Sequence, residues 1–227
     1  MRTKALLIGD IRFQFKYGFY FLYLVFTVFY ISLLHALPAA WRGQAAILML
    51  FSDPAAMGLI FMGAIVLYEK GERVLNSISV SPVKPMEYVI SKLISIALIS
   101  TIAGLLIGLG GGVITNAFLF VPGIFLGSCL LSAIGLMIAA NISTLNQFIV
   151  AIIPAEVIIN APAVVWLFGW KPGWLILHPG VCIIELCQNG ADVLPAVFIL
   201  TFWTILAALF ASHVLANSLR SLGGIKL

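Results

Sequence analysis

One acidic residue lies well inside an apolar stretch of the sequence, which makes it the first candidate for chemistry. Glu156 follows Pro154, and Asn160 comes one helical turn later on the same face. About eight helical residues, at about 1.5 Å each, place its carboxyl group roughly 12 Å into a membrane. A carboxylate at that depth is costly unless it is neutral, paired or hydrated. Two interpretations stay open: the three residues line a translocation path, or Glu156 is protonated and bonded to a neighbouring helix, with Pro154 a simple kink.

A second group of residues has the spacing of metal ligands. His178, Cys182 and Glu185 stand at i, i+4 and i+7, which would place them on one helix face in an arrangement that could suit zinc. No fourth ligand is evident nearby. We therefore predict no metal site in this chain.

The main charged connection between apolar stretches is residues 69–92. A short helix in its middle has one apolar face and one polar face. The apolar stripe consists of Val74, Leu75 and Ile78. Gly71 loosens the preceding helix, and Ser81-Pro82 ends the short one, because a residue before proline is driven out of helical geometry. Such a helix either docks on a cytoplasmic partner or merely joins two membrane spans at the interface.

The composition requires lipid as the main solvent for the chain. Of its 227 residues, 63% are hydrophobic and 9% are charged, whereas soluble domains are about 45–50% apolar and about 25% charged. A soluble core of this length could not bury so much apolar surface. The 12 Lys and Arg residues are scattered at the ends of apolar stretches rather than gathered in a stripe, which excludes nucleic-acid binding.

Six stretches are long enough to cross a membrane, which takes about 20 apolar residues. They are roughly 17–37, 46–68, 93–114, 117–139, 148–169 and 194–216. The second contains Asp53-Pro54, a helix-start signal. Either its helix begins at Pro54 and runs beyond the membrane to Lys70, with 43–52 as a re-entrant or interfacial piece, or a longer helix is kinked there. The predicted fold is an all-α, polytopic membrane protein with six spans.

The distribution of positive charge predicts the orientation. With both termini in the cytoplasm, ten Lys and Arg residues lie inside and two, Arg42 and Lys171, lie outside, as the positive-inside rule requires. Residues 1–16 predict an amphipathic helix on the cytoplasmic membrane surface, or a basic tail that only sets topology. The apolar stripe of this segment is Ala5, Ile8, Ile11 and Phe15.

Glycines at intervals of four residues predict close helix packing. They are Gly104, Gly108 and Gly112 in the third span, and Gly123 and Gly127 in the fourth. In lipid, small residues let helix backbones approach one another. We expect the third and fourth spans of the same chain to pack through them.

The run EKGERVLNSISVSPVKPMEYVISK, residues 69–92, resembles the loop between the second and third helices of ABC-2 type transporter permeases. The preceding run FSDPAAMGLIFMGAIVLYEKGER is similar to that of drug exporters of this family, including the fluoroquinolone-export type. The resemblance implies a single transmembrane domain over 1–227, with an interfacial helix at 1–16, a coupling helix within 69–92 and an outer re-entrant hairpin at 170–192.

The resemblance also implies a function and a set of partners. Two permease copies or paralogues pair, and each binds a separate ATPase subunit that carries ATP and Mg. Glu69, Glu72 and Arg73 would contact or orient the ATPase, and Val74, Leu75 and Ile78 would fill its groove. The remaining members of the implied coupling loop are Gly71 and Pro82.

The implied function is export of a drug-like, lipid-like or peptide substrate across a bacterial inner membrane, with no cofactor on this chain. No Gly-x-x-x-x-Gly-Lys-Ser/Thr motif is present, so the chain is expected to be a transport subunit and not an enzyme. Signatures of a membrane-embedded hydrolase are also missing from the sequence. The alternative is an ATP-independent channel or secondary transporter, although no internal repeat typical of such carriers is apparent.

Overall fold

A computed structural model describes the backbone of residues 2–52 and 56–222, and every regular element within those ranges is a helix. The elements are α1 (Arg2–Lys16), α2 (Phe19–Ala36), α3 (Ala39–Leu50), α4 (Ala56–Gly71), α5 (Val74–Ser79), α6 (Pro85–Gly111), α7 (Ala117–Ala140), α8 (Leu145–Leu167), the 3-10 helix η2 (Gly173–Leu177), α9 (Pro179–Gln188) and α10 (Val193–Leu222). The all-helical fold predicted from the sequence is confirmed for the described residues.

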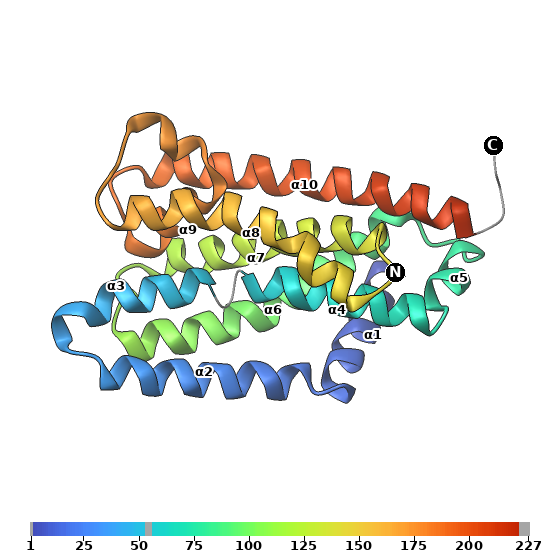
Figure 1. The fold of residues 1–227 in the computed structure, drawn as a ribbon, viewed down its shortest axis with the longest axis horizontal. Helices are drawn as coiled ribbons and strands as arrows, with labels where there is room; N and C mark the ends of the chain where they lie inside the picture. Colours follow the sequence, from blue (N-terminus) through green and yellow to red (C-terminus); the bar gives the residue numbers. More distant parts are fainter. Residues whose placement is uncertain (1, 53–55, 223–227) are drawn as a thin grey trace.

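Five helices in the described ranges are long and apolar enough to cross a membrane: α2, α6, α7, α8 and α10. A polytopic membrane protein is therefore confirmed. The predicted second span, 46–68, differs from the expectation because it is divided between α3, with 12 residues, and α4, with 16. Asp53-Pro54, predicted to start or kink this helix, lies outside the described residues. Figure 1 shows α3 and α4 lying end to end along the bundle, so that together they match the length of their neighbours.

The helices run back and forth along the long axis of the molecule (Figure 1). The described ends of α1 and α10 lie towards one end of the bundle, together with α5, and α9 lies at the other. This arrangement agrees with an even number of passes. We call the α5 end the inner end and the α9 end the outer end; which of them faces the cytoplasm stays a prediction.

Two helices form the centre of the bundle and three lie at its edge. In the most apolar stretch of each helix, 61% of residues are buried in α6 and 56% in α7, against 17% in α2, 22% in α8 and 17% in α10. The edge helices therefore present their apolar residues outward, where lipid would cover them.

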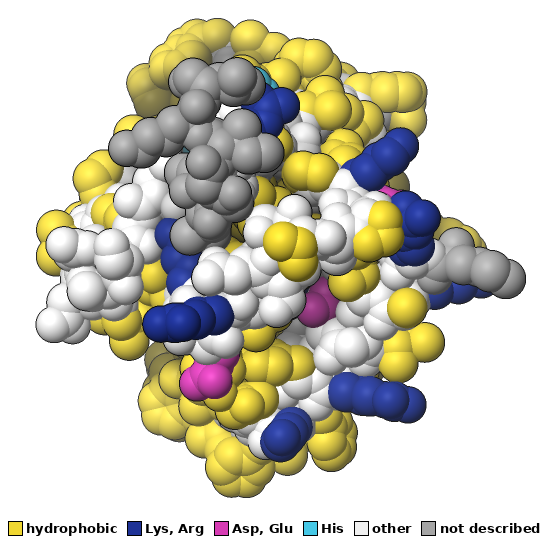
Figure 2. Space-filling model, turned by 90° about the vertical axis from the view of Figure 1, so that its right-hand side faces the viewer, with side chains coloured by type: hydrophobic (Ala, Val, Ile, Leu, Met, Phe, Trp, Pro, Cys, Tyr) yellow, Lys and Arg dark blue, Asp and Glu magenta, His cyan; other side chains and the backbone are white. Residues whose placement is uncertain are grey.

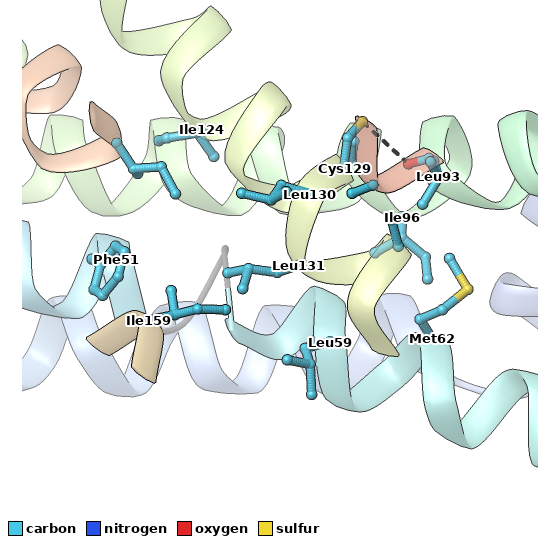
Figure 3. Close-up of a cluster of buried hydrophobic side chains, with 14 of the residues drawn as sticks. Phe51, Leu59, Met62, Leu93, Ile96, Ile124, Cys129, Leu130, Leu131 and Ile159 are labelled. Carbon is cyan, nitrogen blue, oxygen red and sulfur yellow. Dashed lines mark hydrogen bonds between the residues drawn. The ribbon is translucent and has the colours of Figure 1, made fainter. Parts of the chain in front are cut away.

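The core forms where α4, α6 and α7 meet (Figure 3). Leu59 and Met62 reach it from α4, and Cys129 of α7 donates a weak hydrogen bond from Sγ to the carbonyl of Leu93, 3.8 Å away. A Cβ at Gly135 of α7 would collide with the backbone of Leu59. Only glycine therefore permits this approach of the two helices.

The glycines of these two series pack within the chain, as expected, but not all of them lie between the third and fourth spans. A Cβ on Gly108 would meet the ring of Phe120 on α7 at 2.6 Å. Gly123 and Gly127 instead face α9, where added Cβ atoms would lie 2.8 Å from Leu186 and 2.7 Å from Ile183. The expectation was wrong for these two because the α9 segment turns back against α7 and occupies that face.

The last glycine of the α6 series has a different role. Gly112 ends α6 in a left-handed conformation with φ of 65°, and nothing lies within 4 Å of an added Cβ. It is a helix cap, where glycine is favoured because it has no Cβ. Spacing alone did not distinguish a cap from a packing position.

Candidate functional site

A short helix lies in the predicted place: α5, a helix of six residues at the inner end. Arg73 precedes it in a left-handed conformation, with φ of 56°. After it, the hydroxyl of Ser81 donates to the carbonyl of Ile78 over 2.8 Å, and the guanidinium of Arg2 donates to the carbonyl of Pro82 over 2.8 Å. The helix therefore ends in a hydrogen-bonded turn, and the segment after it is held by α1.

The apolar stripe of α5 points mostly into the chain's own core. Leu75 is 1% exposed and Ile78 packs against the same core, with α4 and α10 as neighbours. Leu75 is therefore unavailable to a partner in this conformation, contrary to its expected role. The outward face carries Val74, which is 38% exposed, and Val80, which is 85% exposed.

The charged residues of the loop are likewise partly exposed and partly buried. Glu72 and Arg73 are exposed, and Gly71 is exposed beside them. Glu69 is buried and accepts hydrogen bonds from the ammonium of Lys92 and from the hydroxyl of Tyr88. Its expected contact with a partner is thus replaced by contacts inside the chain.

A buried charge cluster surrounds Glu69. Lys92, 2% exposed, also donates to Oδ1 of Asp10 at 2.6 Å, so that one ammonium joins a carboxylate of α1 to a carboxylate of α4. The sequence offered no signal for this cluster, because Asp10 lies 82 positions from Lys92 and no local spacing relates them.

The next residue of α4, Lys70, connects this helix to α7. Nζ of Lys70 donates to the carbonyl oxygens of Ala139, Ala140 and Ile142 at 2.8, 2.6 and 2.9 Å. These carbonyls belong to the last turn of α7 and the loop after it, where a cation is favoured by the helix dipole. Adjacent side chains thus fasten the end of α4 to α1 and α6 on one side and to α7 on the other.

A polar hollow of about 410 Å³ opens beside α5 at this end. It is lined by Lys70, Gly71, Leu75, Asn76, Ala140, Asn141, Ile142, Ser143 and Ser218. Figure 2 views the inner end and shows Lys and Arg side chains distributed over it, with hydrophobic side chains around the periphery. This end therefore has the character of a protein-facing or headgroup-facing surface.

Two of the predicted translocation residues come together on α8. Nδ2 of Asn160 donates to Oε2 of Glu156 over 2.6 Å, and both side chains are half-buried. Pro154, inside the same helix, is exposed. The pair stands at the border of a broad exposed apolar face that includes Val157 and Ile158. A carboxyl group with one neutral donor, next to a surface that lipid or a second subunit would cover, fits both interpretations of Glu156.

The residues with metal-ligand spacing do not converge. Oε2 of Glu185 accepts from the indole nitrogen of Trp166 at 2.9 Å, and Sγ of Cys182 donates to the carbonyl of Ile176 at 3.1 Å. No group of three potential metal ligands occurs in the part of the chain that the structure describes.

His178 instead faces an apolar crevice. Its Nδ1 is buried without a hydrogen-bond partner, and the ring borders a cavity of about 410 Å³ between α7, α8 and α10. Burial lowers the pKa of His178 below 6.5, opposed by the carbonyl of Ile158, which favours the charged form. His178 is the only polar residue among those lining the crevice in the described part of the chain.

The profile of the Fluoroquinolones export permease protein family matches residues 1–222. The chain belongs to this family. Two curated relatives, each called a Fluoroquinolones export permease protein, come from Mycobacterium tuberculosis strains CDC 1551 / Oshkosh and ATCC 25618 / H37Rv. Each is 25% identical over 194 residues, which cover 70% of this chain and 80% of the relative.

The family confirms the resemblance to fluoroquinolone-export permeases stated from the run FSDPAAMGLIFMGAIVLYEKGER, and it assigns the chain to transmembrane export permeases. In this export permease the predicted loop residues Glu72, Arg73 and Val74 are exposed. Glu69 and Leu75 are buried. The sequence did not indicate that Asp10 and Lys92 are buried as well.

Proposed function

We propose that this chain is the membrane subunit of an ATP-driven exporter whose ATPase is a separate polypeptide that carries ATP and Mg. The observation that carries the proposal is α5, a short helix at the inner end with Leu75 buried against the bundle and Val74 exposed. Membership of an export permease family supports the same reading. A second permease copy or paralogue would complete the transporter.

The anchoring of α5 explains how a push from an ATPase would reach the spans. Leu75 fixes the helix to the bundle, while Glu69 and Lys70 fasten the preceding helix to α1, α6 and α7. A displacement of α5 would therefore move several helices together. In this reading the ATPase contacts Glu72, Arg73, Val74 and the exposed Val80.

We propose a drug-like substrate, because the relatives are called fluoroquinolones export permeases. The exposed face of α8 would line a path between two permease copies, with Glu156 and Asn160 at its border. Replacing Glu156 with Gln should change drug resistance while leaving expression intact. Normal expression and transport in a Glu156→Leu variant would assign this residue a structural role at most.

The coupling experiment compares the two faces of α5. Val74→Asp combined with Val80→Asp should leave a folded protein that no longer co-purifies with the ATPase or exports drug. The matched control is Lys84→Asp, because Lys84 is exposed and lies outside α5. Val83→Asp is unsuitable, because Val83 is part-buried and packs against the core. Full transport by the double variant, or by cells without the ATPase, would favour the alternative of a channel or secondary transporter.

The proposed location is a bacterial inner membrane with both termini in the cytoplasm. All three cysteines are buried, so serine replacements provide a background for single-cysteine labelling. A cysteine at Lys4 should require a membrane-permeant reagent, and one at the exposed Lys171 should react with an impermeant reagent in intact cells. The reverse pattern would invert the topology.

A further inference from the structure

The orientation of α1 is fixed by polar contacts on one of its faces. Oδ1 of Asp10 accepts from Lys92 of α6 at 2.6 Å, and Nε2 of Gln14 donates to the hydroxyl of Ser95 on the same helix at 2.8 Å. Both α1 side chains are buried, and they stand one helical turn apart. This face is therefore held against α6, and the opposite face of α1 points away from the bundle.

The outward side of α1 carries four exposed cations. They are Arg2, Lys4, Arg12 and Lys16. Asp10 is the only acidic residue of this helix, and it is turned inward. Arg12 and Lys16 stand one turn apart, where like charges destabilise each other. The ion pairs among the described residues both belong to Lys92, so these two cations have no counter-charge in the described part of the chain.

Uncovered apolar side chains lie between these cations. Ile8 is 52% exposed and Phe15 is 71% exposed. With 3.6 residues per turn, both project between Lys4 on one side and Arg12 on the other. An apolar stripe flanked by cations is typical of a helix in a membrane interface, because the stripe enters the acyl region while the cations stay at the headgroups.

The position of α1 in the chain favours lipid over a protein partner on this face. Only Tyr17 and Gly18 separate α1 from α2, which is long and apolar enough to cross a membrane. Phe15 lies beside Tyr20 in the first turns of α2, with 5.4 Å between the ring centroids. Figure 1 shows α1 lying across the inner end of the bundle, at an angle to α2. Phe15 is therefore at the level where α2 enters the membrane.

We propose that the outward face of α1 binds anionic membrane lipid. A headgroup phosphate lies between Arg12 and Lys16 and supplies the counter-charge that the described residues lack, since both side chains form charge-assisted hydrogen bonds to phosphate oxygens. Phe15 lies among the acyl chains beside Tyr20. A lipid with net negative charge is favoured over a zwitterionic one, because the surface potential attracts each cation. Binding at this face does not depend on any ATPase.

The test measures which lipid the full-length protein retains. Protein purified in mild detergent is equilibrated with equal amounts of phosphatidylglycerol and phosphatidylcholine with identical acyl chains, and bound lipids are counted by native mass spectrometry. The native protein should retain phosphatidylglycerol preferentially, and less so as salt is added. Arg12→Gln combined with Lys16→Gln should lower this preference by about 10-fold or more, because each cation near an anionic surface contributes about 5-fold.

The matched control removes two cations from the same end of the bundle but outside α1. Arg73→Gln combined with Lys84→Gln changes two exposed positions and should leave the lipid preference within about 2-fold of the native value. Equal losses in the two double variants would show that total charge, not this face, selects the lipid. That result would overturn the proposal, as would an unchanged preference in the Arg12→Gln, Lys16→Gln variant.

Spin labels test the depth of Phe15 independently of lipid preference. In a background with serine at the three buried cysteines, a nitroxide on Phe15→Cys is studied in liposomes that contain phosphatidylglycerol. It should be more accessible to oxygen than to a water-soluble nickel complex, and a nitroxide on the exposed Arg73→Cys should show the reverse. A label at position 15 that favours the nickel complex would place this face in water and overturn the proposal.

Discussion

The two ends of the bundle each bury a carboxylate, but they stabilise it in different ways. At the inner end, Glu69 is paired with a lysine and connects helices that are distant in the sequence. At the outer end, Glu185 is 2% exposed and is satisfied by neutral donors, the indole of Trp166 at 2.9 Å and the backbone N–H of Asp192 at 3.3 Å.

The difference indicates what each end is built to do. A charge pair that joins three helices responds to any movement of those helices, because separating the charges leaves them uncompensated. The outer carboxylate fastens α9 to the adjacent α8 and to the loop that follows it, and Lys171 lies over the Trp166 ring at 5.2 Å. The carboxylate at the inner end thus links helices that are distant in the sequence. The carboxylate at the outer end holds α9 to the segments next to it in the chain.

The largest effect should come from removing the cation of the inner end. Lys92→Met leaves Glu69 buried without a counter-charge, and breaking such a pair costs about 3–5 kcal/mol. The melting temperature and the yield of monodisperse protein in detergent measure this loss. Lys84→Met, at an exposed position one residue before α6, is the matched control and should be nearly neutral. Equal behaviour of the two variants would mean that the cluster contributes nothing to stability.

A smaller effect is expected at the outer end. Glu185→Leu leaves the Trp166 indole and the Asp192 N–H without their acceptor, at about 1–3 kcal/mol. Glu185→Gln should cost less than Glu185→Leu, because the amide oxygen can still accept from Trp166 and only the 3.3 Å bond from the Asp192 N–H is lost. The comparison of the two ends therefore predicts a small loss of stability for Gln at position 185 and a large one for Gln at position 69. Melting temperatures of both variants test this, and similar losses would remove the distinction.

The sequence predicted the long helices well where apolar residues alone decide them. The expected stretch 117–139 corresponds to α7 at Ala117–Ala140, and 148–169 to α8 at Leu145–Leu167. The helix of the third span was expected to begin at Pro85 and to enter the membrane after Lys92, and α6 does begin at Pro85. A lysine at a membrane boundary is expected to reach the headgroups; this one is satisfied by carboxylates inside the chain, which no local pattern reveals.

The sequence predicted the place of the short helix but not the direction in which its apolar stripe faces. A short amphipathic helix was expected within 69–92, and α5 occupies Val74–Ser79 there. Its apolar stripe fits a partner's groove or the chain's own core equally well, and sequence spacing does not choose between them. The structure places Leu75 in the core, because α4 and α10 provide apolar neighbours that lie far from α5 along the chain or across a turn.

The smallest effect concerns pH at the outer end, where His178 enters the apolar crevice. Burial lowers the pKa of His178 below 6.5, so the folded state favours the neutral ring. Stability from this residue is therefore fully present above about pH 6.5 and is lost as the pH falls, since the unfolded chain binds the proton more readily. The melting temperature of the native protein should decrease between about pH 7 and pH 5, and His178→Leu should reduce that dependence.

The matched control for this change is His35, whose side chain is exposed on α2. His35→Gln should leave the acid dependence in place. If His178→Leu leaves the acid loss unchanged, the neutral ring in the crevice contributes nothing to stability, and the outer end responds to pH through some other group.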